Sequence, residues 1–180
     1  MEENKGLLLK CAMSYGLAMG IFWVIKYLFL IFGYSTHSFI YVYQILSLAV
    51  PFVAYYLTKR YRQDIGGSIS FFHAWRFGIM LYFFAALIVS IEHFIFFQFI
   101  APPDFIQNTM NQAMALMKNA DVSSEVIDAV SRTNFTPIHI TIQQIFNNIF
   151  YGILFSVPVA ALVCRRQTIT PVSDESLEEN

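Results

Sequence analysis

Apolar residues dominate four long stretches of the chain, which run from about residue 7 to 32, 39 to 57, 71 to 100 and 138 to 164. Each is long enough to cross a bilayer core as one helix, which takes about 20 mostly apolar residues. The third exceeds the length of one perpendicular span, so we expect it to tilt or to begin at the interface. The pattern therefore predicts an all-α membrane protein built as a four-transmembrane-helix bundle.

Helix-end signals mark the start of two spans. Thr136 can cap the fourth span, because Pro137 suits the first helical position, where its missing N–H is not needed. Gly66 and Gly67 suit a flexible turn before the third span, with Ser70 as its N-cap. No phosphate-binding motif follows these glycines. We therefore interpret the pair as a turn and not as a ligand site.

The more polar segment 101–136 carries a helical pattern of its own. Asp104 can cap a first helix with one apolar stripe, and Ser123 can cap a second, short helix over 124–131. We expect the two to form a short helical cap in the outer loop between spans three and four. The stripe can lie on the bundle or lipid surface, or it can form a pliable groove for a partner. It consists of Ile106, Met110, Ala113, Met114 and Met117.

Composition excludes most other classes. The 180 residues are 57% hydrophobic and 13% charged, against about 25% charged in soluble domains. The net charge of −1 leaves no basic surface for phosphates, so we expect no nucleic-acid partner. One domain over residues 1–167 and a disordered acidic tail over 168–180 account for the length.

Basic residues predict the orientation. Lys and Arg gather near both termini and after the second span, whereas Lys118 and Arg132 lie in the cap segment. Because an excess of basic residues marks cytoplasmic loops, we expect a multi-pass protein with both termini cytoplasmic. Aromatic and basic residues at the cytoplasmic side can contact lipid headgroups. We expect such contacts from Tyr61, Arg62, Trp75 and Arg76.

Three short runs carry a family resemblance. They are Tyr61-Arg62-Gln63-Asp64 followed by Gly66-Gly67, Ile69-Ser70-Phe71 leading to Ala74, and Pro103-Asp104-Phe105. On these motifs the chain resembles the family of short bacterial membrane proteins catalogued as domain of unknown function 4199. The resemblance covers most of the chain and implies four spans in a bacterial inner (cytoplasmic) membrane. It implies no activity, because the family has no assigned chemistry.

Two ionisable residues stand out at membrane depth inside the predicted spans. Lys26 is six residues and Glu92 eight residues from the outer end of its span, roughly 9 to 12 Å deep at about 1.5 Å per residue. A charge at the bilayer centre costs about 2.5 to 3.5 kcal/mol on insertion scales, so each needs a partner or a water-filled path. Small residues on the same helical faces predict close helix packing. They are Ala12, Gly16 and Gly20 beside Lys26, and Gly78 and Ala85 beside Glu92.

Other polar residues occur at a similar depth in the remaining spans. We hypothesise a buried hydrogen-bonded cluster, centred on an ion pair between Lys26 and Glu92, that can line an outward-facing vestibule. Its members are Lys26, Gln44, Glu92, His93, Gln143, Gln144, Asn147 and Asn148. Three interpretations stay open: a purely structural cluster, a proton or cation pathway, or unconnected residues with a snorkelling lysine and a protonated glutamate.

No catalytic motif is present in the sequence. The histidines lack metal-ligand spacing and the two cysteines lack CxxC spacing, so we expect no metal, no cofactor and no enzyme activity. We expect a non-catalytic structural or accessory component, in contact with the lipid bilayer, that can associate with itself or with another membrane protein. The alternative is a small proton- or cation-linked transporter or channel that uses the cluster around Glu92. A dry, fully paired polar layer favours the first, and a solvent path to Glu92 favours the second.

Overall fold

The computed structural model describes residues 5–33, 36, 38–133 and 135–164. This part of the chain is helical throughout and has no strand. The predicted tail, 168–180, lies outside the described residues. The elements in chain order are α1 (Lys5–Gly33), α2 (Ser38–Asp64), α3 (Phe71–Ile95), a π-helical turn η1 (Phe96–Ile100), α4 (Phe105–Asn119), α5 (Ser124–Ser131) and α6 (Pro137–Val163).

Four of these segments are long and apolar enough to cross a membrane: α1, α2, α3 with η1, and α6. The predicted fold class and the four spans are thereby confirmed. The helix α2 continues beyond residue 57, the predicted end of the second span, through the basic segment to Asp64. Tyr61 explains the extension, since its ring is buried and stacks on Phe77 with centroids 4.0 Å apart. The last turns of α2 therefore pack on α3.

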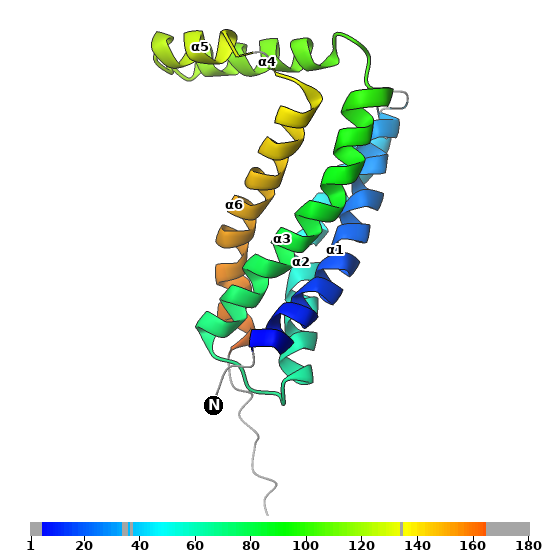
Figure 1. The fold of residues 1–180 in the computed structure, drawn as a ribbon, viewed down its shortest axis with the longest axis vertical. Helices are drawn as coiled ribbons and strands as arrows, with labels where there is room; N and C mark the ends of the chain where they lie inside the picture. The colour runs from blue at the N-terminus through cyan, green and yellow to red at the C-terminus, as the bar shows by residue number, and fades with distance from the viewer. Residues whose placement is uncertain (1–4, 34–35, 37, 134, 165–180) are drawn as a thin grey trace, which may run out of the picture.

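The four spans run alongside one another, and α3 makes its most extensive contacts with α1 and α6 (Figure 1). Helices α4 and α5 lie across one end of the bundle, which we call the cap end. At the opposite end, the basal end, α1 begins and α6 ends (Figure 1). The described helices therefore form one bundle with a helical cap between the third and fourth spans, as predicted.

Small residues allow α3 to approach its neighbours closely. A Cβ added to Gly16 would come within 2.5 Å of the Phe84 Cβ, and one added to Gly78 would come within 2.5 Å of the Ser156 Oγ. A Cβ added to Gly20 would come within 2.7 Å of the Ile88 Cβ, and Ala12 and Ala85 are fully buried. The predicted helix-packing positions are therefore confirmed. Gly152, which packs against Tyr82, was not among the predicted positions.

Both predicted helix starts are present. Gly66 and Gly67 adopt φ values of +99° and +82°, a left-handed conformation that costs glycine little. The Ser70 hydroxyl then accepts a hydrogen bond from the backbone N–H of His73, and α3 begins at Phe71. Thr136 precedes α6 and forms a capping box with His139, and Pro137 is the first helical residue.

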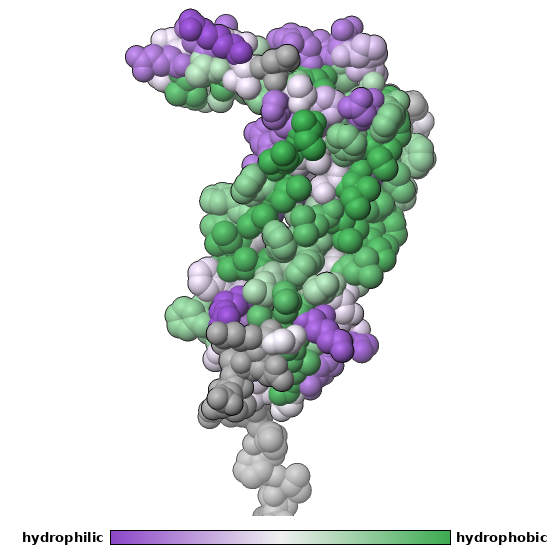
Figure 2. Space-filling model, in the orientation of Figure 1, coloured by the Kyte–Doolittle hydropathy of each residue, from purple (hydrophilic) through white to green (hydrophobic). Residues whose placement is uncertain are grey.

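The cap helices also have the predicted bounds. Neither α4 nor α5 contains a buried residue. The five stripe residues of α4 are half-buried, whereas Leu116, outside the stripe, is 68% exposed. Figure 2 shows hydrophilic surface on the side of the pair that faces away from the bundle and hydrophobic surface beneath it. The stripe is thus partly covered and takes no part in the main core.

Candidate functional site

Lys26 lies inside the bundle, as predicted. Its side chain is 7% exposed. The ammonium nitrogen lies over three aromatic rings, 5.6 Å from the centroid of Trp23, 4.5 Å from Tyr27 and 5.3 Å from Tyr43. Because an aromatic face attracts a cation, α1 and α2 together surround this charge without a carboxylate.

Glu92 on α3 differs from Lys26 in what surrounds its ionisable group. Both carboxylate oxygens are buried, and neither has a hydrogen-bond partner among the described residues. Lys26 and Glu92 interact electrostatically, but they form no direct hydrogen bond. The hypothesis of a direct ion pair is therefore wrong in its geometry. The lysine lies against aromatic rings instead, which leaves the carboxylate without a donor from the described chain.

Glu92 lines a cavity of about 270 Å³ near the cap end, which we call the Glu92 cavity. Seven of its residues were absent from the predicted cluster because they are apolar or aromatic side chains from α1, α2, η1 and α4. Its full lining is Tyr27, Leu30, Ile31, Tyr43, Glu92, His93, Phe96, Phe97, Phe105 and Gln144. The predicted outward-facing vestibule thus has a counterpart, with aromatic walls and one carboxylate.

His93 is fixed in the wall of this cavity. It is 8% exposed, and its Nδ1 lies 2.8 Å from the carbonyl oxygen of Val89. Because a carbonyl oxygen can only accept, Nδ1 donates this hydrogen bond and carries a hydrogen. The ring also packs edge-on against Tyr27 at 4.4 Å. These two contacts set the orientation of the imidazole beside Glu92.

The π-helical turn η1 follows the site residues directly. The N–H of Phe96 donates to the carbonyls of Glu92 and His93, and the N–H of Ala101 donates to the carbonyl of Phe96. Phe105 at the start of α4 contacts Phe96 and Phe97, with ring centroids 5.5 and 6.1 Å apart. The first residue of α4, Phe105, therefore forms part of the wall of the Glu92 cavity. Single π-helical turns often occur at functional sites. The aromatic run after Glu92 was the sequence signal for this wall.

The polar face of α6 is divided between the inside and the outside of the bundle. Gln144 lines the cavity, and Asn148 is half-buried, with an amide nitrogen that has no partner in the described part of the chain. Gln143 and Asn147 are exposed, as is Gln44 on α2, so their predicted burial is wrong. Successive helical residues are about 100° apart, and the predicted polar arc was wider than the face that α6 buries.

Three of the predicted headgroup residues join elements at the basal end. Tyr61 is 1% exposed, and its hydroxyl lies 2.6 Å from Nε2 of His73, so its predicted position in the headgroup layer is wrong. Arg62 donates to the carbonyls of Gly67 and Val163, and the Trp75 indole N–H donates to the carbonyl of Ile153. Arg76 is exposed, and its lipid contact stays a prediction.

Further buried polar atoms lie below the cavity. The indole nitrogen of Trp23, the hydroxyl of Tyr82 and the hydroxyl of Ser156 are buried, with no hydrogen-bond partner among the residues that the structure describes. The rings of Trp23 and Tyr82 are 5.6 Å apart, and Trp23 also contacts the ammonium of Lys26. Polar groups without partners thus continue from the cavity into the core. The described residues contain no cluster of three His, Cys, Asp or Glu side chains that could hold a metal ion.

Comparison with known proteins identifies a family but no activity. No curated protein and no solved structure matches the chain. One family matches residues 14–165, which include most of the first span, the other three spans and every residue of the Glu92 cavity. The chain therefore belongs to the family described as "Protein of unknown function (DUF4199)".

Proposed function

We propose that this multi-pass membrane protein is a small proton- or cation-linked transporter in which Glu92 is the binding group. One observation carries the proposal: both carboxylate oxygens of Glu92 are buried at a cavity wall, with no partner in the described chain. A buried carboxylate without a partner costs several kcal/mol, so it favours binding of a proton or a cation. A purely structural cluster would be expected to pair it.

The core below the cavity supports passage and not only binding. Trp23, Tyr82 and Ser156 come from three different spans, and each contributes a polar atom without a partner in the described chain. Tyr82 is ten residues from Glu92 along α3, which corresponds to about 15 Å. These groups offer hydrogen bonds to water or to a moving proton at a second depth in the bundle.

The charge distribution supports an orientation in a bacterial inner membrane. Basic residues with described positions gather at the basal end, among them Lys59, Arg60 and Arg62, whereas the cap carries Lys118 and Arg132. By the positive-inside rule, both termini are cytoplasmic and the Glu92 cavity lies near the periplasmic surface. The site then meets protons or cations that arrive from outside the cell.

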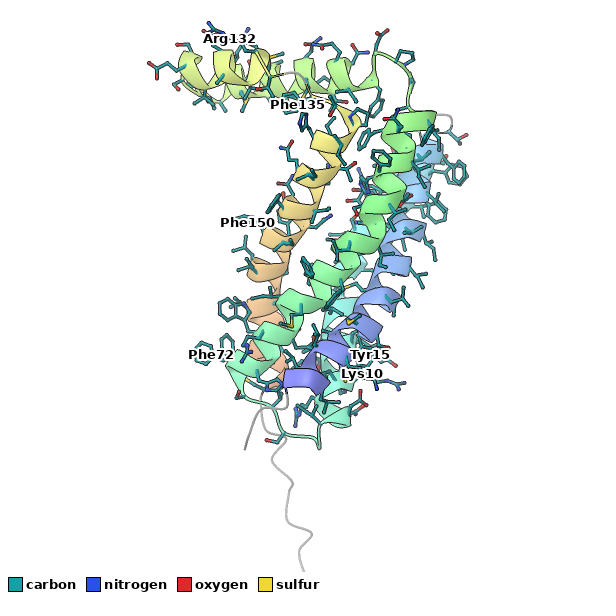
Figure 3. All side chains as sticks on the ribbon, in the orientation of Figure 1. Lys10, Tyr15, Phe72, Arg132, Phe135 and Phe150 are labelled. Carbon is teal, nitrogen blue, oxygen red and sulfur yellow. The ribbon has the colours of Figure 1, made fainter. Side chains whose placement is uncertain are left out.

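The exposed half of the α6 polar face suits a second copy of the chain as partner. Gln143 and Asn147 lie about 9 and 15 Å from the start of α6, in the region that lipid surrounds. Phe150, 60% exposed, points away from the bundle from the same helix (Figure 3). Two copies related by an axis along the membrane normal bring each residue to its own counterpart. Since an amide both donates and accepts, it can pair with itself across such an interface.

The test of transport uses purified protein in liposomes. A pH gradient should drive proton movement, measured with an enclosed pH-sensitive dye, faster than in empty vesicles. Glu92→Gln should lower this rate at least tenfold, because the amide cannot carry the exchangeable proton. The matched control is Glu125→Gln, which neutralises an exposed carboxylate on α5 and should leave the rate unchanged. Equal rates for wild type and Glu92→Gln would refute the proposal.

A non-catalytic structural or accessory component is the second candidate. The half-exposed methionine stripe of α4 favours it, because methionine-rich surfaces adapt to partner proteins. In either case we propose that the protein is not an enzyme. Wild-type vesicles with no flux above background would favour this candidate.

A further inference from the structure

We infer that the Glu92 cavity binds a small organic ammonium ion, which exchanges with a proton on the Glu92 carboxylate. This inference rests on the proposed function, because Glu92 is the binding group in both. It adds the chemical class of the substrate, which follows from the size of the cavity, the chemistry of its walls and the position of Lys26.

The size of the cavity favours an organic ion. At about 30 Å³ per water molecule, 270 Å³ holds on the order of nine non-hydrogen atoms. A bare proton or a single inorganic cation fills only a small part of this space. A hydrated inorganic cation could fill it, but half of the lining would then offer its water shell no hydrogen bond, namely Leu30, Ile31, Phe96, Phe97 and Phe105.

The walls favour an alkylated cation over a metal ion. Tyr27, Tyr43, Phe96, Phe97 and Phe105 contribute aromatic rings, and two aliphatic side chains complete the apolar surface. Ca²⁺ and Mg²⁺ prefer several oxygen ligands, and the described residues gather no such acidic cluster. Aromatic rings around a single carboxylate are instead the arrangement that holds quaternary and alkylated ammonium groups.

Lys26 demonstrates the affinity of these walls for an ammonium group. Its own ammonium lies over Tyr27 and Tyr43, and both rings also line the cavity. The lysine side chain is not part of the lining, so the cavity side of the rings remains accessible to a second cation. The two rings can therefore contact the chain's own ammonium and a bound one.

The exchange keeps the charge of the site constant. When the ammonium ion enters, the O–H bond of the protonated Glu92 carboxyl breaks and the proton leaves to water. The carboxylate that remains is then paired with the ammonium ion. No electron is transferred, and one positive charge replaces another beside Lys26. A single carboxylate can therefore hold either ion but not both, so the two ions compete for one site.

The experiment measures binding of tetraethylammonium to the full chain in nanodiscs by calorimetry. Repeating it in two buffers of different ionisation enthalpy counts the protons released, and we expect about one per bound ion at a pH where the empty site is protonated. Potassium chloride at the same concentration should produce no such release. Glu92→Gln should abolish both binding and proton release.

Variants of Phe97 test the aromatic wall. Phe97→Leu should weaken tetraethylammonium binding about tenfold, because it removes one cation–π contact. Phe97→Tyr keeps the ring and should bind within about twofold of wild type, which separates loss of the ring from general damage to the site. The control Phe72→Leu makes the same change at the basal end, where Phe72 is 69% exposed, and should leave binding unchanged (Figure 3).

The outcomes separate the two proposals. Proton flux that depends on Glu92, without tetraethylammonium binding, would overturn the ammonium inference and leave the transporter proposal standing. Binding that is equal in wild type and Phe97→Leu, or that releases no proton at any pH between 5 and 9, would also overturn the inference. Absence of both flux and binding would overturn both proposals.

Discussion

At the basal end of the bundle, the side chains of Tyr61 and Arg62 bond to other parts of the chain, whereas the buried polar atoms without such a partner begin at Ser156 and continue toward the cap end. Tyr61 bonds to His73, and Arg62 reaches the carbonyl of Val163 across the bundle. Near the cap, the Glu92 carboxylate and the Asn148 amide nitrogen have no partner within the described chain. The basal half thus contributes stability, and the cap half keeps polar groups available for a ligand.

The same contrast holds for packing. Phe77 and Ala74 in the basal half of α3 are at most 1% exposed, and Gly78 lies directly against Ser156 of α6. The cap half of the same helix borders a cavity of about 270 Å³. Since cavities cost stability, the tightly packed half has to compensate for the open one. Substitutions should therefore affect folding most at the basal end and ligand handling most at the cap end.

The largest stability effect is expected at Gly78. In Gly78→Ala the new Cβ would lie 2.5 Å from the Ser156 Oγ and 2.7 Å from its Cβ, so α3 and α6 must separate. Overpacking of this kind typically costs about 1 to 3 kcal/mol, and we expect that loss in the free energy of unfolding. Unfolding of the purified protein in increasing concentrations of denaturing detergent measures it.

A compensating substitution tests the cause of this loss. Ser156→Gly removes both close atoms and leaves the Ser156 Cα at 3.6 Å, an ordinary contact. The double variant Gly78→Ala with Ser156→Gly should therefore lose less stability than the sum of the single losses. Strict additivity would show that steric conflict at this contact is not the reason.

A smaller effect on stability is expected when tyrosine is replaced by phenylalanine at Tyr61 near the basal end and at Tyr82 below the Glu92 cavity. Tyr61 and Tyr82 are both at most 2% exposed, but only the Tyr61 hydroxyl has an observed partner, His73. Tyr61→Phe should lower the free energy of unfolding by about 1 kcal/mol, the usual net value of a hydrogen bond. Tyr82→Phe should change it by less than about 0.5 kcal/mol, because no protein hydrogen bond is lost.

The two substitutions should affect proton flux in the opposite order to their effects on stability. Tyr82→Phe removes a polar group below the Glu92 cavity and should slow the flux through the core, whereas Tyr61→Phe should leave the flux per folded protein unchanged. Equal losses of stability in the two variants, as measured by unfolding in detergent, would contradict the difference in pairing between the two ends.

Local features of the chain could be predicted from the sequence, whereas the exact partners of buried groups on other helices could not. Spans, caps and close-packing glycines depend on composition and on local spacing, so residues such as Gly16, Gly66 and Thr136 were interpreted correctly. The depth of Lys26 and Glu92 followed from counting along the helices. Their exact partners did not follow, because these depend on how far each helix rotates about its axis.

The rotation of each helix about its axis also explains why some residues of the predicted polar cluster do not belong to the site. A rotation of about 100° decides whether Asn147 or Asn148 faces the bundle, and the sequence places both on one polar arc. The contribution of Phe105 to the cavity wall could not be predicted either, because it depends on how the start of α4 packs against Phe96 of η1. Long-range contacts of this kind carry no local periodic signal.

The smallest effect is expected where a polar group faces outward near the cap. Asn147 is exposed on α6 in a region that lipid surrounds, and an interhelical amide contact in a membrane contributes about 0.6 kcal/mol on average. Since each Asn147 meets its own counterpart, the dimer has one such contact, and Asn147→Leu should raise the dissociation constant of the dimer about threefold. Energy transfer between labelled copies diluted into increasing amounts of lipid measures this constant. Asn148→Leu provides the control, since Asn148 is half-buried one residue away and should leave dimerisation unchanged. If both substitutions weakened the dimer equally, the outward amides would not be what joins the copies, and the exposed polar face of α6 would need a different partner.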